Sequence, residues 1–197
     1  SQFAATTGEF NTSLGSLSMG TGVTTGNSNV AIGYQSGHAL TSGSENITIG
    51  QGAGDALTTG NRNVAVGHAA LSTENEHGKN VAIGYLSLLT LDAGVDGFNV
   101  AVGYSAGLAM TTGTRNTLVG GAAGDALTTG VRNVAIGYAA LSQEDANSYN
   151  VAIGDSALTQ LNAGADGYNV AVGYQAGTAM TTAIKNTLIG ALSGDAI

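Results

Sequence analysis

Residues 133–137, Asn-Val-Ala-Ile-Gly, carry the motif that decides the fold. The motif Asn-[apolar or Thr]-x-[Ile or Val]-Gly occurs ten times, at spacings of 17 residues apart from two spacings of 19. A degenerate copy, Asn-Thr-Ser-Leu-Gly, occupies residues 11–15. Helical patterns repeat every 3.6 residues, whereas a fixed period of this length is typical of a solenoid whose turns stack on one another. The ten copies begin at Asn29, Asn46, Asn63, Asn80, Asn99, Asn116, Asn133, Asn150, Asn169 and Asn186.

A longer repeat covers four of these turns. Residues 46–115 and 116–185 align without gaps and are identical at 43 of 70 positions. Partial repeats occupy residues 11–45 and 186–197. We therefore expect residues 1–197 to form one repetitive segment, and to be a fragment of a longer fibre because the last turn stops without a polar cap.

Within each turn, the motif predicts one short strand. When the Asn is counted as position 1, positions 2 and 4 are Val or Ile in most copies and share one face of that strand. We expect them to form the small core of each turn, together with a second strand or packed edge that contains an Ala-Leu or Ala-Met pair. Position 3 is Ala in seven copies, which predicts close approach there by another part of the turn or by another chain.

The first and last residues of the motif are predicted to be corners. Glycine at position 5 favours a positive φ or a tight turn, and asparagine at position 1 favours a side-chain hydrogen bond that repeats from turn to turn. The fold expected is all-β, a parallel β-solenoid (β-roll or β-helix) of about ten turns of 17–19 residues. The corner residues that represent this pattern are Asn29, Gly33, Asn63, Gly67, Asn99, Gly103, Asn133, Gly137, Asn169 and Gly173.

Composition excludes several classes of function. The chain has no cysteine, so it has no disulfide or thiolate metal site. Five basic and thirteen acidic residues give a net charge of −8, which argues against binding to nucleic acid or to an anionic membrane surface. No apolar run approaches the ~18 residues of a membrane-spanning helix.

Two short strings resemble catalytic motifs. Residues 103–107 match the G-x-S-x-G elbow of hydrolases, and residues 154–158 resemble a G-D-S-L start. The sister repeat replaces Ser105 by Gln175, and the three histidines (His38, His68 and His77) all precede Ser105. The sequence therefore predicts neither an enzyme nor a cofactor.

Two sets of residues are candidates for binding. Tyrosine follows the corner glycine in five copies and could contact a receptor glycan through its ring face and hydroxyl. The polar insertions of the two 19-residue turns contain aspartates that could bind calcium, although the six to eight oxygens that calcium needs are not evident. The tyrosines are Tyr34, Tyr85, Tyr104, Tyr138 and Tyr174, and the aspartates are Asp92, Asp96 and Asp166.

Residues 133–141, Asn-Val-Ala-Ile-Gly-Tyr-Ala-Ala-Leu, resemble the N-[ST]-[AV]-[AI]-G repeats of trimeric fibrous adhesins. Such repeats occur in the heads of bacterial trimeric autotransporter adhesins, which are left-handed parallel β-rolls, and in bacteriophage tail fibres. The spacing of 17 residues, the Tyr after Gly and the Thr-Thr-Gly turn are more similar to the phage fibres. The resemblance covers residues 11–197 and implies a homotrimer.

The resemblance also implies a function and a location. The chain would be a structural and adhesive segment of an extracellular virion tail fibre, which extends and stiffens a receptor-binding structure. Its partners would be its own copies and a host-surface glycan or protein. The alternatives are the head of a bacterial surface adhesin, an ice-binding solenoid with threonine arrays, and a glycan-degrading tailspike with paired carboxylates.

Overall fold

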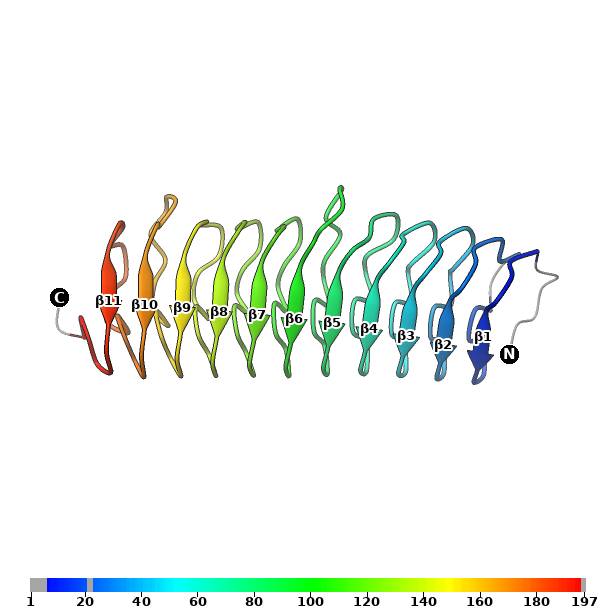
Figure 1. The fold of residues 1–197 in the computed structure, drawn as a ribbon, viewed down its shortest axis with the longest axis horizontal. Coiled ribbons are helices and arrows are strands. Elements are labelled where there is room, and N and C mark those ends of the chain that lie inside the picture. Colours follow the sequence, from blue (N-terminus) through cyan, green and yellow to red (C-terminus); the bar gives the residue numbers. More distant parts are fainter. Residues whose placement is uncertain (1–6, 21–22, 196–197) are drawn as a thin grey trace.

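Each copy of the motif forms one three-residue strand. The computed structural model describes residues 7–20 and 23–195, and in it eleven strands pair in parallel in chain order, β1 next to β2 and onward to β11. The strands stack into a rod with the two chain ends at opposite ends (Figure 1). The strands are β1 Thr12–Leu14, β2 Val30–Ile32, β3 Ile47–Ile49, β4 Val64–Val66, β5 Val81–Ile83, β6 Val100–Val102, β7 Thr117–Val119, β8 Val134–Ile136, β9 Val151–Ile153, β10 Val170–Val172 and β11 Thr187–Ile189.

The parallel solenoid expected from the repeat is confirmed, and the degenerate copy at residues 11–15 supplies its first strand. The second apolar group of each turn, its Ala-Leu or Ala-Met pair, lies in a packed edge made of turns. It forms no second strand in the described residues. Backbone hydrogen bonds still join this edge from turn to turn, as from Gly54 N to Ala70 O at 2.9 Å. The described residues contain no helix with the length and apolar character needed to cross a membrane.

The two faces of each strand are reversed relative to the sequence prediction. Alanine at position 3 points into the rod and is fully buried, as at Ala101 and Ala135. Val and Ile at positions 2 and 4 lie on the outer face, and Ile83 and Ile136 are each 37% exposed. The buried apolar residues of the described chain are only Ala, Leu and Met. The prediction that the Val and Ile residues form the core is therefore wrong, because position 3 of each strand, and not positions 2 and 4, faces the returning chain.

An unbroken asparagine ladder runs the length of the rod. The side-chain Oδ1 of each motif asparagine accepts a hydrogen bond from the backbone N–H of the asparagine in the following turn, at 2.8–3.3 Å from Asn11 to Asn186. The side-chain nitrogen of Asn99 also donates to Gly113 O at 2.9 Å, near the end of the same turn. Asparagine therefore links each turn to its neighbour, and in most of the 17-residue turns its side-chain nitrogen also closes the turn.

Glycine at position 5 forms a second corner of each turn. Its φ lies in the left-handed region, for example +146° at Gly103. A β-carbon built on Gly103 would lie 2.3 Å from Gly120 O, so neighbouring corners are too close for any side chain. Both the conformation and the close approach require glycine here.

The two variants of the repeat fill the core differently. Where position 3 carries the larger Thr48 or Leu118, position 9 of the same turn is glycine. A β-carbon on Gly54 would lie 2.7 Å from Thr48 Cγ2, and one on Gly124 would lie 2.8 Å from Leu118 Cδ2. The following turn has alanine at position 3 and fully buried Leu141 at position 9. Core volume is thus divided between positions 3 and 9 in these turns. The turns that have both alanine at position 3 and glycine at position 9 precede a turn with a larger residue at position 3, and a β-carbon on Gly107 would lie 2.9 Å from Leu118 Cδ1 of that next turn.

The two 19-residue turns keep the register of the sheet. Val81 of β5 pairs with Val100 of β6, and Val151 of β9 pairs with Val170 of β10, as in the shorter turns. The additional residues form excursions at the rim of the rod next to these strands (Figure 1). A β-carbon on Gly94, within the first insertion, would meet nothing within 4 Å.

Candidate functional site

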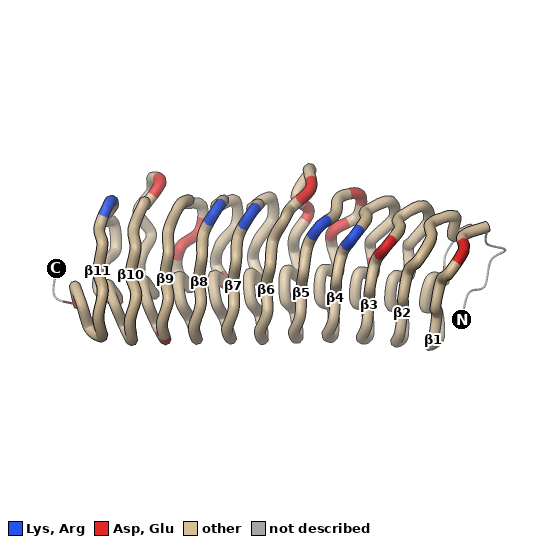
Figure 2. The backbone as a smooth tube through the Cα atoms, in the orientation of Figure 1, with Lys and Arg blue, Asp and Glu red and all other residues tan. Residues whose placement is uncertain are grey.

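The residue immediately before each motif asparagine forms a column along the rod, here called the pre-asparagine column. All five lysines and arginines of the chain belong to it, and Figure 2 shows them at matching positions of successive turns. Four aromatic residues belong to it as well. Its members are Phe10, Ser28, Glu45, Arg62, Lys79, Phe98, Arg115, Arg132, Tyr149, Tyr168 and Lys185.

The backbone holds every member of the column in one conformation. Their φ values lie between +49° and +63°, the left-handed region that non-glycine residues seldom adopt. The N–H groups of most members donate to a carbonyl of the preceding turn, as Arg115 N does to Gly97 O at 2.8 Å. Since each member has the same conformation and the strands repeat at about 4.8 Å, the side chains stand in a regular row.

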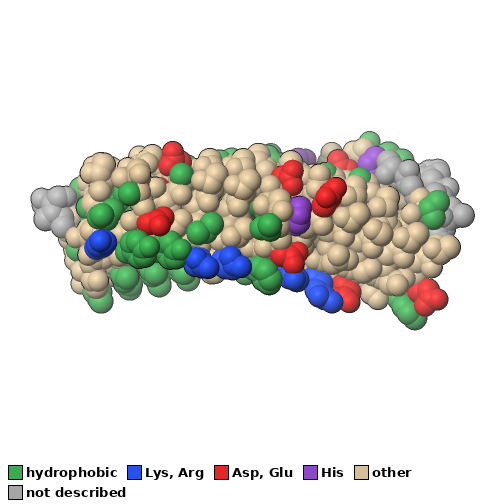
Figure 3. Space-filling model, turned by 90° about the horizontal axis from the view of Figure 1, so that it is seen from above, with side chains coloured by type: hydrophobic (Ala, Val, Ile, Leu, Met, Phe, Trp, Pro, Cys, Tyr) green, Lys and Arg blue, Asp and Glu red, His purple; other side chains and the backbone are tan. Residues whose placement is uncertain are grey.

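The C-terminal half of the column is an aromatic and cationic stack. The Arg115 guanidinium lies 5.9 Å from the Phe98 ring centroid, and that of Arg132 lies 5.6 Å from the Tyr149 centroid. Arg132 Nη1 also donates to Tyr149 Oη at 2.8 Å. The rings of Tyr149 and Tyr168 are stacked, 4.9 Å apart and 6° from parallel. Figure 3 shows cationic and hydrophobic side chains in a line along one edge of the rod.

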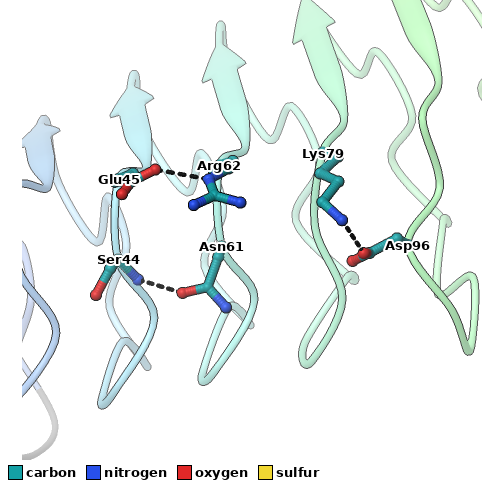
Figure 4. Close-up of a pocket in the computed structure, with 6 residues that line it drawn as sticks. All are labelled: Ser44, Glu45, Asn61, Arg62, Lys79 and Asp96. Carbon is teal, nitrogen blue, oxygen red and sulfur yellow. Dashed lines mark hydrogen bonds and ion pairs between the residues drawn. The ribbon is translucent and has the colours of Figure 1, made fainter.

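The N-terminal half of the column surrounds a shallow polar pocket of about 290 Å³ (Figure 4). Arg62 Nε lies 2.7 Å from Glu45 Oε2, and Lys79 forms an ion pair with Asp96. The hydrogen bond to Glu45 raises the pKa of Arg62, and the hydrogen bond from Lys79 lowers the pKa of Asp96. Both cations of the pocket are thus already neutralised within the chain. The pocket is lined by Ser44, Glu45, Asn61, Arg62, Lys79 and Asp96.

The tyrosines proposed as glycan contacts form a second column, on the other side of the strands. They are 45–64% exposed. The rings of Tyr85 and Tyr104 stack with centroids 5.2 Å apart, and His68 continues the stack at the same distance from Tyr85. Their role in binding a glycan stays a prediction. The members are Tyr34, Tyr85, Tyr104, Tyr138 and Tyr174.

The aspartates proposed as metal ligands do not converge on one another. Asp92 approaches Glu74 and His77, whose potential ligand atoms all lie within 4.8 Å of one another. Asp96 pairs with Lys79 instead, and the exposed Asp166 belongs to no group of three potential ligands within the described residues. Calcium binding at these turns stays a prediction.

The burial of Glu74 has a structural explanation that also applies to Glu144, its counterpart in the second 70-residue repeat. The buried Glu74 carboxylate accepts hydrogen bonds from His77 N and Ala93 N, each at 3.2 Å. Glu144 is buried in the same way and accepts from Asn147 N at 3.1 Å, although asparagine there replaces histidine. Burial raises the pKa of both glutamates. The shared feature is a carboxylate that closes a turn, whatever residues stand beside it.

The first threonine of three of the threonine pairs donates its hydroxyl to the backbone. The hydroxyl of Thr58 donates to Asn75 O at 3.1 Å, and that of Thr111 donates to Thr128 O at 3.2 Å in the next turn. These hydroxyls hold neighbouring turns together, which argues against a free threonine array for ice.

The resemblance to hydrolase motifs finds no support in the geometry. Ser105 lies in the turn after β6, with φ +54°. His38 contacts Asp55 at 3.4 Å, His77 lies beside Glu74, and His68 stacks on Tyr85. All three histidines belong to turns that precede that of Ser105.

Sequence analysis missed the pre-asparagine column. Its members differ so much in chemistry that they look like a variable position. The signal that could have found it is that each lysine and arginine of the chain directly precedes a motif asparagine.

Comparison of the chain with protein-family models, with curated proteins and with solved structures finds no match.

Proposed function

We propose that this chain is a shaft segment of a homotrimeric attachment fibre, with a mechanical and adhesive role and no catalytic one. The observation that carries this proposal is the outer face of the sheet. Positions 2 and 4 of the eleven strands contain only Val, Ile, Leu and Thr, with no charge in a chain of net charge −8. A continuous apolar face of this kind is typical of an interaction surface.

Further copies of the same chain are the partner that fits this face. The branched side chains repeat at every turn, so a parallel copy presents an apolar row at the same interval. Association would cover the Val and Ile residues on the outer face of the strands. It would also add buried apolar area to a rod whose own core holds only Ala, Leu and Met. The number three comes from the resemblance to trimeric adhesin repeats.

The setting that follows is extracellular. A stiff rod with unlike ends suits a spacer between an anchoring part and a receptor-binding tip, as in a virion tail fibre. A bacterial surface adhesin head would use the same fold and the same interface, and stands as the second candidate.

Sedimentation velocity combined with light scattering tests the proposal. We expect an elongated particle with three times the mass of the 19.3 kDa chain. A monomer that persists at micromolar concentration would overturn the proposal.

A pair of variants locates the interface. Ile83→Lys with Ile136→Lys places charge on the outer face and should dissociate the trimer into folded monomers. Thr59→Lys with Thr129→Lys adds the same charge at exposed turn positions and should leave the mass unchanged. Equal behaviour of the two variants would contradict the assignment of the interface to this face.

A further inference from the structure

We propose that the C-terminal half of the pre-asparagine column, from Phe98 to Lys185, binds an extended anionic polysaccharide laid along the rod. The polysaccharide would carry carboxylate or sulfate groups. The inference deepens the attachment function and rests on it for its biological setting, whereas the binding itself needs only one rod. It is separate from the tyrosine column that follows the corner glycines.

The distribution of charge is the first argument. All five cations of an acidic chain stand in this one column. Among the described residues, Arg62 and Lys79 are paired with carboxylates, while Arg115, Arg132 and Lys185 have no ion-pair partner. From Phe98 to Lys185 the column itself contains no acid. A polyanion would therefore meet uncompensated positive charge only along this segment.

The rigidity of the column is the second argument. All six backbone positions have the same left-handed conformation, the N–H groups of Arg115, Arg132, Tyr149 and Lys185 donate to the neighbouring turn, and Arg115 and Arg132 also rest on aromatic rings. Holding a long cationic side chain in place before binding lowers the entropy cost of using it. The side chains of the pre-asparagine column are thus preorganised before a ligand binds.

The linear shape selects the class of ligand. Cations confined to one line suit a linear polymer better than a flat anionic membrane. Duplex DNA carries one charge per about 1.7 Å, far denser than the cations here, and the rest of the rod would repel it. A polysaccharide has sparse charges separated by hydroxyls. The hydroxyls of Tyr149 and Tyr168, between Arg132 and Lys185, offer hydrogen bonds to those intervening groups.

Affinity electrophoresis of the full chain tests the proposal. The gels contain alginate as the carboxylate polymer, dextran sulfate as the sulfated polymer, or neutral dextran. We expect retardation by at least one anionic polymer, no retardation by dextran, and loss of retardation at high salt, where exposed charges are screened. Retardation by alginate alone or by dextran sulfate alone identifies the anionic group. If neither alginate nor dextran sulfate retards the chain at low salt, the proposal is overturned. Binding to single-stranded DNA that is stronger than binding to both polysaccharides would overturn it as well.

Charge-matched variants localise the effect. Arg115→Gln with Arg132→Gln should weaken binding by about tenfold. Thr59→Asp with Thr129→Asp makes the same change in net charge at exposed positions outside the column and should bind nearly as the parent does. Arg62→Gln with Glu45→Gln removes a neutralised pair and should also have little effect. Equal weakening by the first two variants would show a net-charge effect and overturn the site.

The same samples separate this inference from the proposed function. If they sediment as elongated trimers but none is retarded, the polysaccharide site is wrong and the fibre proposal stands. If the chain is a monomer that is retarded and loses binding on Arg115→Gln with Arg132→Gln, the site is right and the fibre proposal is wrong.

Discussion

The motif asparagine of most 17-residue turns forms two kinds of hydrogen bond, one to the next turn and one within its own turn. Asn99 is 1% exposed, and its Oδ1 accepts from Asn116 N at 3.0 Å while its Nδ2 donates to Gly113 O at 2.9 Å. The first bond joins two turns and the second closes one turn. A shorter side chain would leave a buried N–H and a buried carbonyl without partners.

Replacing this asparagine tests the ladder. Asn99→Ala should destabilise the protein by about 2–5 kcal/mol, because two buried backbone groups lose their partners. The measurement is the free energy of unfolding from chemical denaturation. Asn186→Ala, at the partly exposed end of the ladder, should cost less than about 1 kcal/mol because water can replace the lost bonds. Equal losses at both positions would contradict this account.

Glycine is required at position 5 of the turn, as at Gly103, whereas other residues are tolerated at position 7, as at Gly52. Gly103→Ala should cost about 3 kcal/mol or more, because its β-carbon would lie 2.3 Å from a carbonyl oxygen that the sheet holds fixed. Gly52 also has a positive φ, +64°, but its β-carbon would meet nothing within 4 Å. Gly52→Ala should cost at most about 1–2 kcal/mol, since Ala69 and Ala122 occupy the same place in other turns at φ +51° and +53°. Comparison of the two melting temperatures checks this.

At the scale of the single turn, core volume is exchanged between positions 3 and 9. Gly124 has φ +56°, and Leu141 stands at the equivalent place in the next turn with φ +55°. The backbone therefore accepts leucine at either site. What excludes it at Gly124 is Leu118, because a β-carbon there would approach Leu118 Cδ2 to 2.8 Å.

A double-mutant cycle tests this exchange. Gly124→Leu alone should cost about 1–3 kcal/mol by overpacking, and Leu118→Ala alone about 2–5 kcal/mol by leaving a cavity. Together they recreate the core of the turn that holds Ala82, Leu88 and Leu91, so the double variant should be more stable than the sum predicts by about 1–3 kcal/mol. Simple additivity in denaturant unfolding would show that the two positions do not share one space.

The sequence predicts the length and the corners of each turn, but not which residues form its core. The period, the asparagine corner and the glycine corner each follow from a residue type with one physical role. Alternation places Val30 and Ile32 on one face without saying which face is inside. Their β-branched character suggested a core, whereas the path of the returning chain places Ala31, on the opposite face of the strand, inside the rod. The pre-asparagine column escaped notice because its residues share a location and not a chemistry.

At the scale of the whole molecule, the stability of the fold should depend on pH through the buried glutamates. Burial raises the folded-state pKa of Glu74 and Glu144. A raised folded pKa means that stability is fully present below the ordinary glutamate pKa and is lost as pH rises through the raised value. We therefore expect the melting temperature to rise as pH falls from neutrality toward the ordinary carboxyl range.

Glu144→Gln isolates this effect from the general relief of negative charge. It should raise the melting temperature at neutral pH by about 2–4 °C for each kcal/mol recovered and flatten the dependence on pH. Glu76→Gln removes the same charge at an exposed site and should do neither. Thermal unfolding followed across the pH range for both variants decides the matter, and a flat profile for the parent protein would contradict the prediction.

The two 19-residue turns show that a turn of this rod can be two residues longer while the register of strand pairing stays the same. The insertions, including Asp92–Gly97 and its sister segment, leave the pairing of β5 with β6 and of β9 with β10 unchanged. Both excursions lie on the same edge of the rod, 70 residues apart along the chain (Figure 1). They are natural graft points: a foreign loop inserted at either one would be displayed at a fixed height, and loops at both would be held a set four turns apart.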